Sequence, residues 1–157
     1  MLFFNGKVVL GVRRFLIMCA TILGLLSSCA TYHNDIQKRM QALPQHYSQF
    51  DAKLAWEVRS TGNSTVIDGM VKNIRYYLMN EFEIWVWSRD DRGKETHRSV
   101  AFVYSLKENE AGQFTLELPL LASGTKLRFL YRYIGHEGGG ESGSASWWSQ
   151  SFASEVP

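Results

Sequence analysis

Beyond Phe50, apolar residues recur at every second position within a series of short runs, and this period constrains the fold more than any other feature. A period of two places alternate side chains on one face of a β-strand, whereas a helix needs a period near 3.6. In the clearest run, residues 81–88, two sets of side chains alternate: Phe82, Ile84 and Val86 on one side and Glu83, Trp85 and Trp87 on the other. The sequence therefore predicts a domain made of strands.

Turn-forming residues divide this region into seven runs, with no helical pattern between them: 53–59, 65–73, 81–88, 99–106, 114–118, 127–133 and 145–152. The polar cluster 89–94 predicts a hairpin turn in which Gly93 takes a positive φ. Seven short strands joined by turns predict a mainly β fold, a single antiparallel sandwich of immunoglobulin-like type. A small closed barrel is the main alternative.

The N-terminal region has a different composition. Arg13 and Arg14 precede twelve mostly apolar residues, 15–26, and small residues then lead into Cys29. This is the layout of a secretory signal. The alternative is an uncleaved membrane anchor, but a spanning helix needs about 20 apolar residues.

Leu26, Ser27, Ser28 and Cys29 resemble the lipobox of bacterial lipoproteins. The resemblance implies that residues 1–28 are removed as a signal peptide and that Cys29 receives a diacylglyceryl group, often with a further N-acyl chain. Several acyl chains together anchor a protein stably to a membrane. Ala30, rather than Asp, follows the cysteine, which in a Gram-negative host implies the periplasmic face of the outer membrane. In another host, the cell membrane is expected.

Removal of residues 1–28 leaves residues 29–157, a length that suits one domain with its own core. The basic residues of the signal are removed with it, so residues 29–157 contain 14 basic and 15 acidic residues. This balance gives no reason to expect nucleic-acid binding. Lipidation uses Cys29, the last remaining cysteine, so the domain must be stable without a disulfide.

Ahead of the strands, apolar residues follow a helical spacing from Asn34 to Tyr47, interrupted by Pro44. We expect a short amphipathic helix in residues 29–50, ahead of a β-sandwich domain in residues 51–157. This helix either packs on the domain or bridges it to the anchor; a docking surface for a partner or the membrane is the alternative.

Two stretches, residues 112–120 and 68–73, resemble strands of bacterial immunoglobulin-like or prealbumin-like accessory domains. Their motifs encode strand and turn geometry rather than chemistry. The resemblance implies a sandwich used for spacing, stability or binding.

The sequence offers no catalytic constellation. Its four histidines are scattered, and none has the spacing that presents paired metal ligands on a helix. The mature chain has no free cysteine nucleophile, and no serine stands in a G-x-S-x-G elbow. We therefore expect no enzyme, no metal and no cofactor.

Four tryptophans remain as candidate binding residues: Trp85, Trp87, Trp147 and Trp148. They belong either to the core, including a face covered by the helix, or to an exposed surface for a protein partner or a glycan. The sequence thus predicts a membrane-anchored envelope lipoprotein that acts as a non-catalytic binding or assembly component, with a probable protein partner. The alternatives are a carbohydrate-binding module for cell-wall or extracellular glycan and a subunit of an enzyme with a catalytic partner chain.

Overall fold

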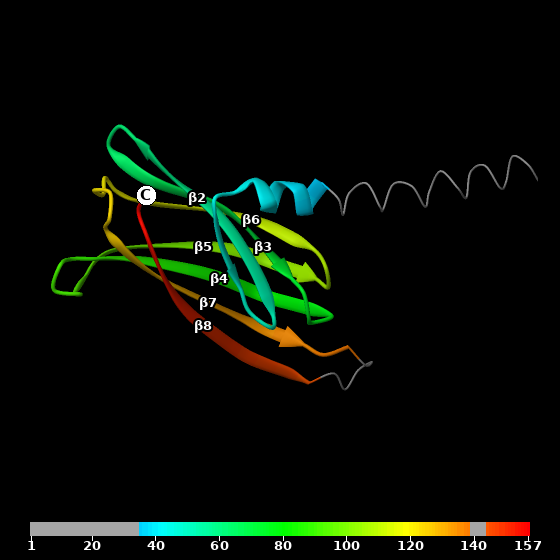
Figure 1. Cartoon of the computed structure of the whole chain (residues 1–157). Helices are drawn as coiled ribbons and strands as arrows, with labels where there is room; N and C mark the ends of the chain where they lie inside the picture. Colours follow the sequence, from blue (N-terminus) through cyan, green and yellow to red (C-terminus); the bar gives the residue numbers. More distant parts are fainter. Residues whose placement is uncertain (1–34, 139–143) are drawn as a thin grey trace, which may run out of the picture. The chain divides into compact units, whose positions relative to one another are not determined.

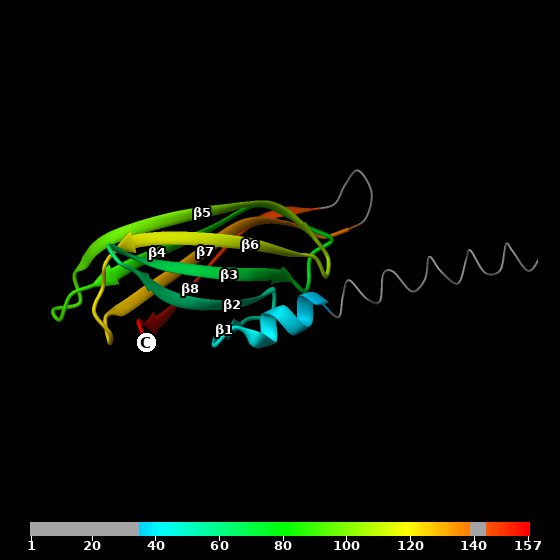
Figure 2. The same ribbon diagram turned by 90° about the horizontal axis from the view of Figure 1, so that it is seen from above.

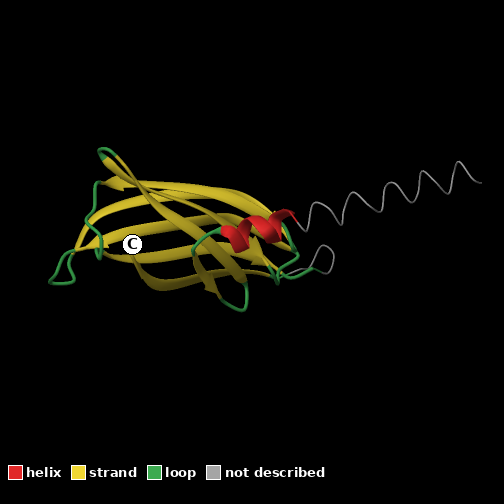
Figure 3. Ribbon diagram, turned by 45° about the horizontal axis from the view of Figure 1, so that its top comes forward, coloured by secondary structure: helices red, strands yellow, loops and turns green. Residues whose placement is uncertain are grey.

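The computed structural model of the protein describes residues 35–138 and 144–157, and strands make up most of this part of the chain (Figure 3). The strands are β1 (Gln45–Ser48), β2 (Ala52–Thr61), β3 (Ser64–Asn73), β4 (Leu78–Arg89), β5 (Glu95–Lys107), β6 (Ala111–Pro119), β7 (Lys126–His136) and β8 (Ala145–Glu155). The mainly β fold predicted from the sequence is confirmed, with eight strands in the described residues rather than the seven expected.

The strands form two four-stranded sheets, ordered β1-β2-β3-β6 and β5-β4-β7-β8, in which all neighbours are antiparallel. Figure 1 shows these sheets as the two layers of a sandwich. At one edge of the sandwich, β5 and β6 run side by side (Figure 2), and the Glu117 N–H of β6 donates to the Ser99 hydroxyl of β5 at 3.2 Å. The sandwich is therefore closed at this edge by contacts between the sheets.

The additional strand, β1, corrects the expectation of a helix from Asn34 to Tyr47. Residues 35–42 are helical, but the helix ends before Pro44, whose ring cannot continue it. From Gln45 the chain is extended and pairs with β2. Tyr47 points into the sandwich and stacks on Phe152 of β8 with ring centroids 3.9 Å apart. This aromatic contact favours a strand where the sequence period also suited a helix.

Large aromatic rings fill the space between the sheets. Phe82 is fully buried and stacks on Tyr131 and Tyr133, with ring centroids 5.4 and 5.9 Å away. Opposite them, the ring of Phe114 lies over Gly69, where a Cβ atom would come within 2.3 Å of it. Gly69, part of the 68–73 motif, is therefore needed so that an aromatic ring can approach the backbone.

A polar link joins the two sheets inside this core. Asp51, just before β2, is fully buried. Its carboxylate accepts hydrogen bonds from the hydroxyls of Tyr131 at 2.9 Å and Tyr133 at 2.5 Å. It also accepts the Ala52 backbone N–H at 2.8 Å. Burial of a charged group is tolerated only with such partners, so these contacts fix the start of β2 against β7.

The turn after β4 has the conformation that the sequence predicts. Gly93 has a φ of 77°, and the Asp90 carboxylate accepts the N–H groups of Arg92 at 3.0 Å and Lys94 at 2.8 Å. The Asp90 carboxylate is thus explained by turn geometry.

The lipobox residues Leu26, Ser27, Ser28 and Cys29 lie outside the described residues. Within the described ranges, no helix is long and apolar enough to cross a membrane.

Candidate binding surface

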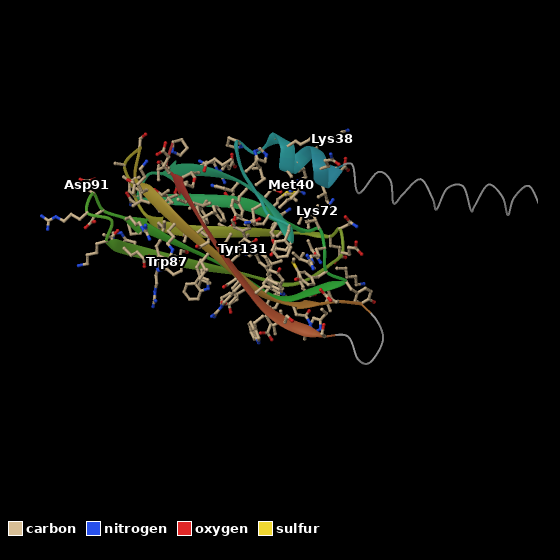
Figure 4. The ribbon with its side chains drawn as sticks, turned by 60° about the horizontal axis from the view of Figure 1, so that its bottom comes forward. Lys38, Met40, Lys72, Trp87, Asp91 and Tyr131 are labelled. Carbon is tan, nitrogen blue, oxygen red and sulfur yellow. The ribbon has the colours of Figure 1, made fainter. Side chains whose placement is uncertain are left out.

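The outer face of the β5-β4-β7-β8 sheet carries most of the tryptophans singled out above. Along β4, buried and half-buried residues alternate, so that Ile84 and Val86 point into the core while Trp85 and Trp87 point outward. Figure 4 labels Trp87 of this outer face and Tyr131 of the core. We call this surface the tryptophan–arginine face, and it consists of Glu83, Trp85, Trp87, Phe102, Arg128, Arg132 and Trp147.

Trp85 and Trp87 form a pair covered by two arginines. Their rings are nearly parallel, with an interplanar angle of 14° and centroids 5.9 Å apart. From β7, the guanidinium of Arg132 lies 6.0 Å from the centroid of the Trp85 ring, and that of Arg128 lies 5.7 Å from the Trp87 ring. These are distances at which a cation is attracted to an aromatic ring. Both indoles are therefore half-buried by their neighbours on the same sheet.

Carboxylates fix these arginines in place. Arg132 Nε donates to Glu83 at 2.6 Å, and the Trp85 indole N–H donates to the same carboxylate at 3.0 Å. The hydrogen bond from Arg132 is the largest of the effects that lower the pKa of Glu83. Arg128 donates in turn to Glu95 of β5 at 2.9 Å. The hydrogen bonds and ring contacts among these side chains thus hold the aromatic rings and the charged groups of the face in fixed positions.

Two exposed aromatic residues extend the face to its margins. Phe102 of β5 lies opposite Glu83 in the sheet register and is 57% exposed. Trp147 of β8 lies opposite Ile134 and is 67% exposed. The face is therefore apolar at both sides of its charged centre.

Trp148 does not belong to this face. It points to the other side of β8, where its ring contacts Phe50 and Tyr76 with centroids 5.6 and 6.3 Å away. The structure thus brings Trp85, Trp87 and Trp147 to one surface and places Trp148 at the margin of the core.

Sequence reasoning missed the arginines and Phe102. The signal was present, because the outward positions of the strand 127–133 read Arg128, Leu130 and Arg132. Only the inward, apolar positions of this strand entered the sequence prediction.

The face suits contact with another surface rather than the enclosure of a small molecule. The described residues contain no cluster of three or more His, Cys, Asp or Glu side chains that could hold a metal ion. Two shallow depressions lie at the loop end of the sandwich; the larger is lined by residues of the 89–93 turn and the 122–127 segment, not by the tryptophans.

No family model and no curated protein matches the sequence. Among solved structures, the chain is similar to the GAE domain of GGA2p from Saccharomyces cerevisiae, with 11% identity, a TM-score of 0.45, and coverage of 72% of this chain and 96% of that one. The C-terminal domain of wzt matches with 14% identity, a TM-score of 0.44 and coverage of 73% and 79%. A protein from Archaeoglobus fulgidus matches with 13% identity, a TM-score of 0.35 and coverage of 72% and 98%. These likenesses are too distant to support a function.

Proposed function

We propose that this protein is a lipid-anchored lipoprotein of the bacterial envelope and acts as a non-catalytic binding or assembly component. The lipobox-like residues Leu26 to Cys29 support the anchor, and Ala30 favours the periplasmic face of the outer membrane in a Gram-negative host. We assign the sandwich to the immunoglobulin-like type because its two antiparallel sheets carry resemblances to such modules in residues 68–73 and 112–120.

The observation that carries the binding role is the tryptophan–arginine face. Tryptophan and arginine are the residue types most enriched among those that dominate protein–protein affinity. Here Arg132 lies over Trp85 and Arg128 lies over Trp87 on an outer sheet face, and exposed Phe102 lies opposite Glu83 on the same face. A protein partner in the cell envelope fits this combination better than nucleic acid does, since both arginines are paired with carboxylates.

A glycan is the second candidate, and exposed Trp147 is the observation that favours it. Sugar rings stack on open aromatic faces, which Trp147 offers. Trp85 and Trp87 fit this role less well because a guanidinium already lies over each ring.

The anchor is tested by intact mass and membrane fractionation of the wild type beside Cys29→Ala. We expect a lipid-sized mass increase at residue 29 that is lost, together with membrane association, in the variant. An unmodified wild-type chain that does not associate with membranes would contradict the lipoprotein proposal.

The binding face is tested by placing a photo-crosslinking amino acid at Phe102 in cells, with Glu117 on the outer side of the other sheet as the control position. We expect one envelope protein to cross-link from position 102 and not from 117, and this adduct to disappear when Trp85 is changed to Ala. Equal cross-linking from both positions would contradict a specific face. Binding of soluble wall oligosaccharides that is lost in Trp147→Ala would instead support the glycan candidate.

A further inference from the structure

β8 is an edge strand without the features that usually protect such edges. It runs for eleven residues, Ala145–Glu155, in continuous register with β7. Residues 145–154 contain no charged residue and no proline. Natural sheets normally shield their edges with charges, proline, bulges or short strands, because an open edge pairs readily with another strand.

In the described part of the chain, the backbone of β8 is open to such pairing. Among the described residues, and apart from its ladder with β7, β8 forms hydrogen bonds only through Ser154 and Glu155 at its C-terminal end, with Gln45 and Lys126 as partners. An edge strand points half of its backbone N–H and C=O groups away from its sheet. Along residues 145–153 these outward groups are available to a further strand.

The other edges of the sandwich differ from β8. β1 has four residues, which makes it a short edge. β5 and β6 lie side by side and are linked from Ser99 to Glu117. β5 also carries Glu95, Arg98 and Lys107. The unprotected edge is therefore confined to one strand.

The sequence of β8 complements itself. Around Gln150 the strand reads symmetrically: serine at one step on each side, an aromatic residue at two steps, and serine again at four steps. When two copies of β8 run antiparallel with Gln150 opposite Gln150, each large residue meets an aromatic or small one and each serine meets a serine. The opposed pairs are Ser149 with Ser151, Trp148 with Phe152, Trp147 with Ala153, and Ser146 with Ser154.

We propose that β8 is a homodimer interface, in which the β8 strands of two copies of this chain pair antiparallel about Gln150. The partner is a second copy rather than a different chain because the strand is complementary to its own reversed sequence from Ser146 to Ser154. Two-fold symmetry requires this property, since the same patch must serve on both subunits. Cross-strand aromatic and serine pairs stabilise antiparallel strands.

Such pairing has a consequence for the outer face. Directly opposed residues of antiparallel strands lie on the same side of a sheet. The two sheets would join into one eight-stranded sheet across the dimer, with both tryptophan–arginine faces on the same side. The dimer proposal does not depend on what that face binds.

The first experiment measures, by sedimentation, the mass of the protein as purified from cells in detergent. We expect a dimer for the wild type. Gln150→Lys and Gln150→Glu each place like charges opposite each other across the two-fold axis, so each variant alone should be monomeric. Mixing the two variants pairs opposite charges and should restore the dimer, which also shows that both are folded.

A second experiment tests the register with cysteines in the membrane-associated protein. Ser149 of one copy opposes Ser151 of the other, so co-expressed Ser149→Cys and Ser151→Cys chains should form a disulfide-linked dimer on a non-reducing gel. Each variant alone, and the wild type, serve as controls and should not. A monomeric wild type, a dimer unaffected by Gln150→Lys, or equal cross-linking of the single variants would overturn the proposal. If β8 pairs with a different chain instead, the purified wild type would be a monomer.

Discussion

Replacing Asp51 by Ala removes the acceptor of three buried hydrogen bonds, two of them from tyrosine hydroxyls that have no access to water. A buried donor left without a partner costs about 1–3 kcal/mol. With Tyr131 and Tyr133 both affected, we expect Asp51→Ala to lower the free energy of unfolding by roughly 3–5 kcal/mol. Since domains are stable by about 5–15 kcal/mol, this is a large share of the total.

The assay is urea unfolding followed by tryptophan fluorescence, with the loss read from the shift of the midpoint at unchanged slope. The matched background is Tyr131→Phe combined with Tyr133→Phe, in which the hydroxyls are already absent. In that background Asp51→Ala should cost much less, because no tyrosine donor is left unpaired. The same loss in both backgrounds, or a loss under about 1 kcal/mol in the wild type, would refute the role assigned to these hydrogen bonds.

Three further predictions follow from the core and the outer face. Burial is the main effect that raises the pKa of Tyr131 and of Tyr133 above the ordinary value of 10.0, so both hydroxyls stay protonated in the folded state and ionise on unfolding. The contribution of these tyrosines to the free energy of unfolding should therefore be complete below pH 10. Above pH 10 it should fall by up to about 1.4 kcal/mol per pH unit for each tyrosine, which urea midpoints between pH 9 and 11 would measure. Gly69→Ala should lower the free energy of unfolding by about 1–3 kcal/mol, since the new methyl group collides with the Phe114 ring. In a Phe114→Leu background the same substitution should cost less, and melting temperatures of the variants would check both expectations. Arg132→Ala should make tryptophan fluorescence easier to quench with acrylamide while leaving the urea midpoint nearly unchanged, because its ion pair is partly exposed. Unchanged quenching would contradict the cation–ring contact.

Seven of the eight described strands could be predicted from the sequence because most of them carry an alternation of apolar residues and turn-forming residues separate them. β1 could not be predicted, because four residues are too few to show a period. Tyr47 also fits a helical stripe of apolar residues with Met40 and Leu43. Its strand conformation depends on pairing with β2 and on the stacking of Tyr47 against Phe152, both of which are tertiary contacts.

The candidate face was accessible to sequence reasoning only in part. Because Trp85 and Trp87 alternate with Phe82, Ile84 and Val86, the sequence indicated a strand with large apolar residues on both faces. It did not indicate which neighbouring side chains cover the tryptophan rings. Their partners Arg128 and Arg132 come from β7, about forty residues later, and sheet order decides that β7 lies beside β4. Local sequence patterns do not determine which distant strands pair.

The carboxylate of Asp51 also has a consequence for the order of folding. Its hydroxyl partners lie 80 and 82 residues further along the chain, whereas the β2–β3, β4–β5 and β7–β8 hairpins close locally. Closing a long loop costs more entropy than closing a hairpin, so we expect the local hairpins to form first and this carboxylate to keep its hydration until β7 docks. We therefore expect these contacts to be absent from the transition state. Weakening them leaves the folding rate nearly unchanged and shortens the lifetime of the native state.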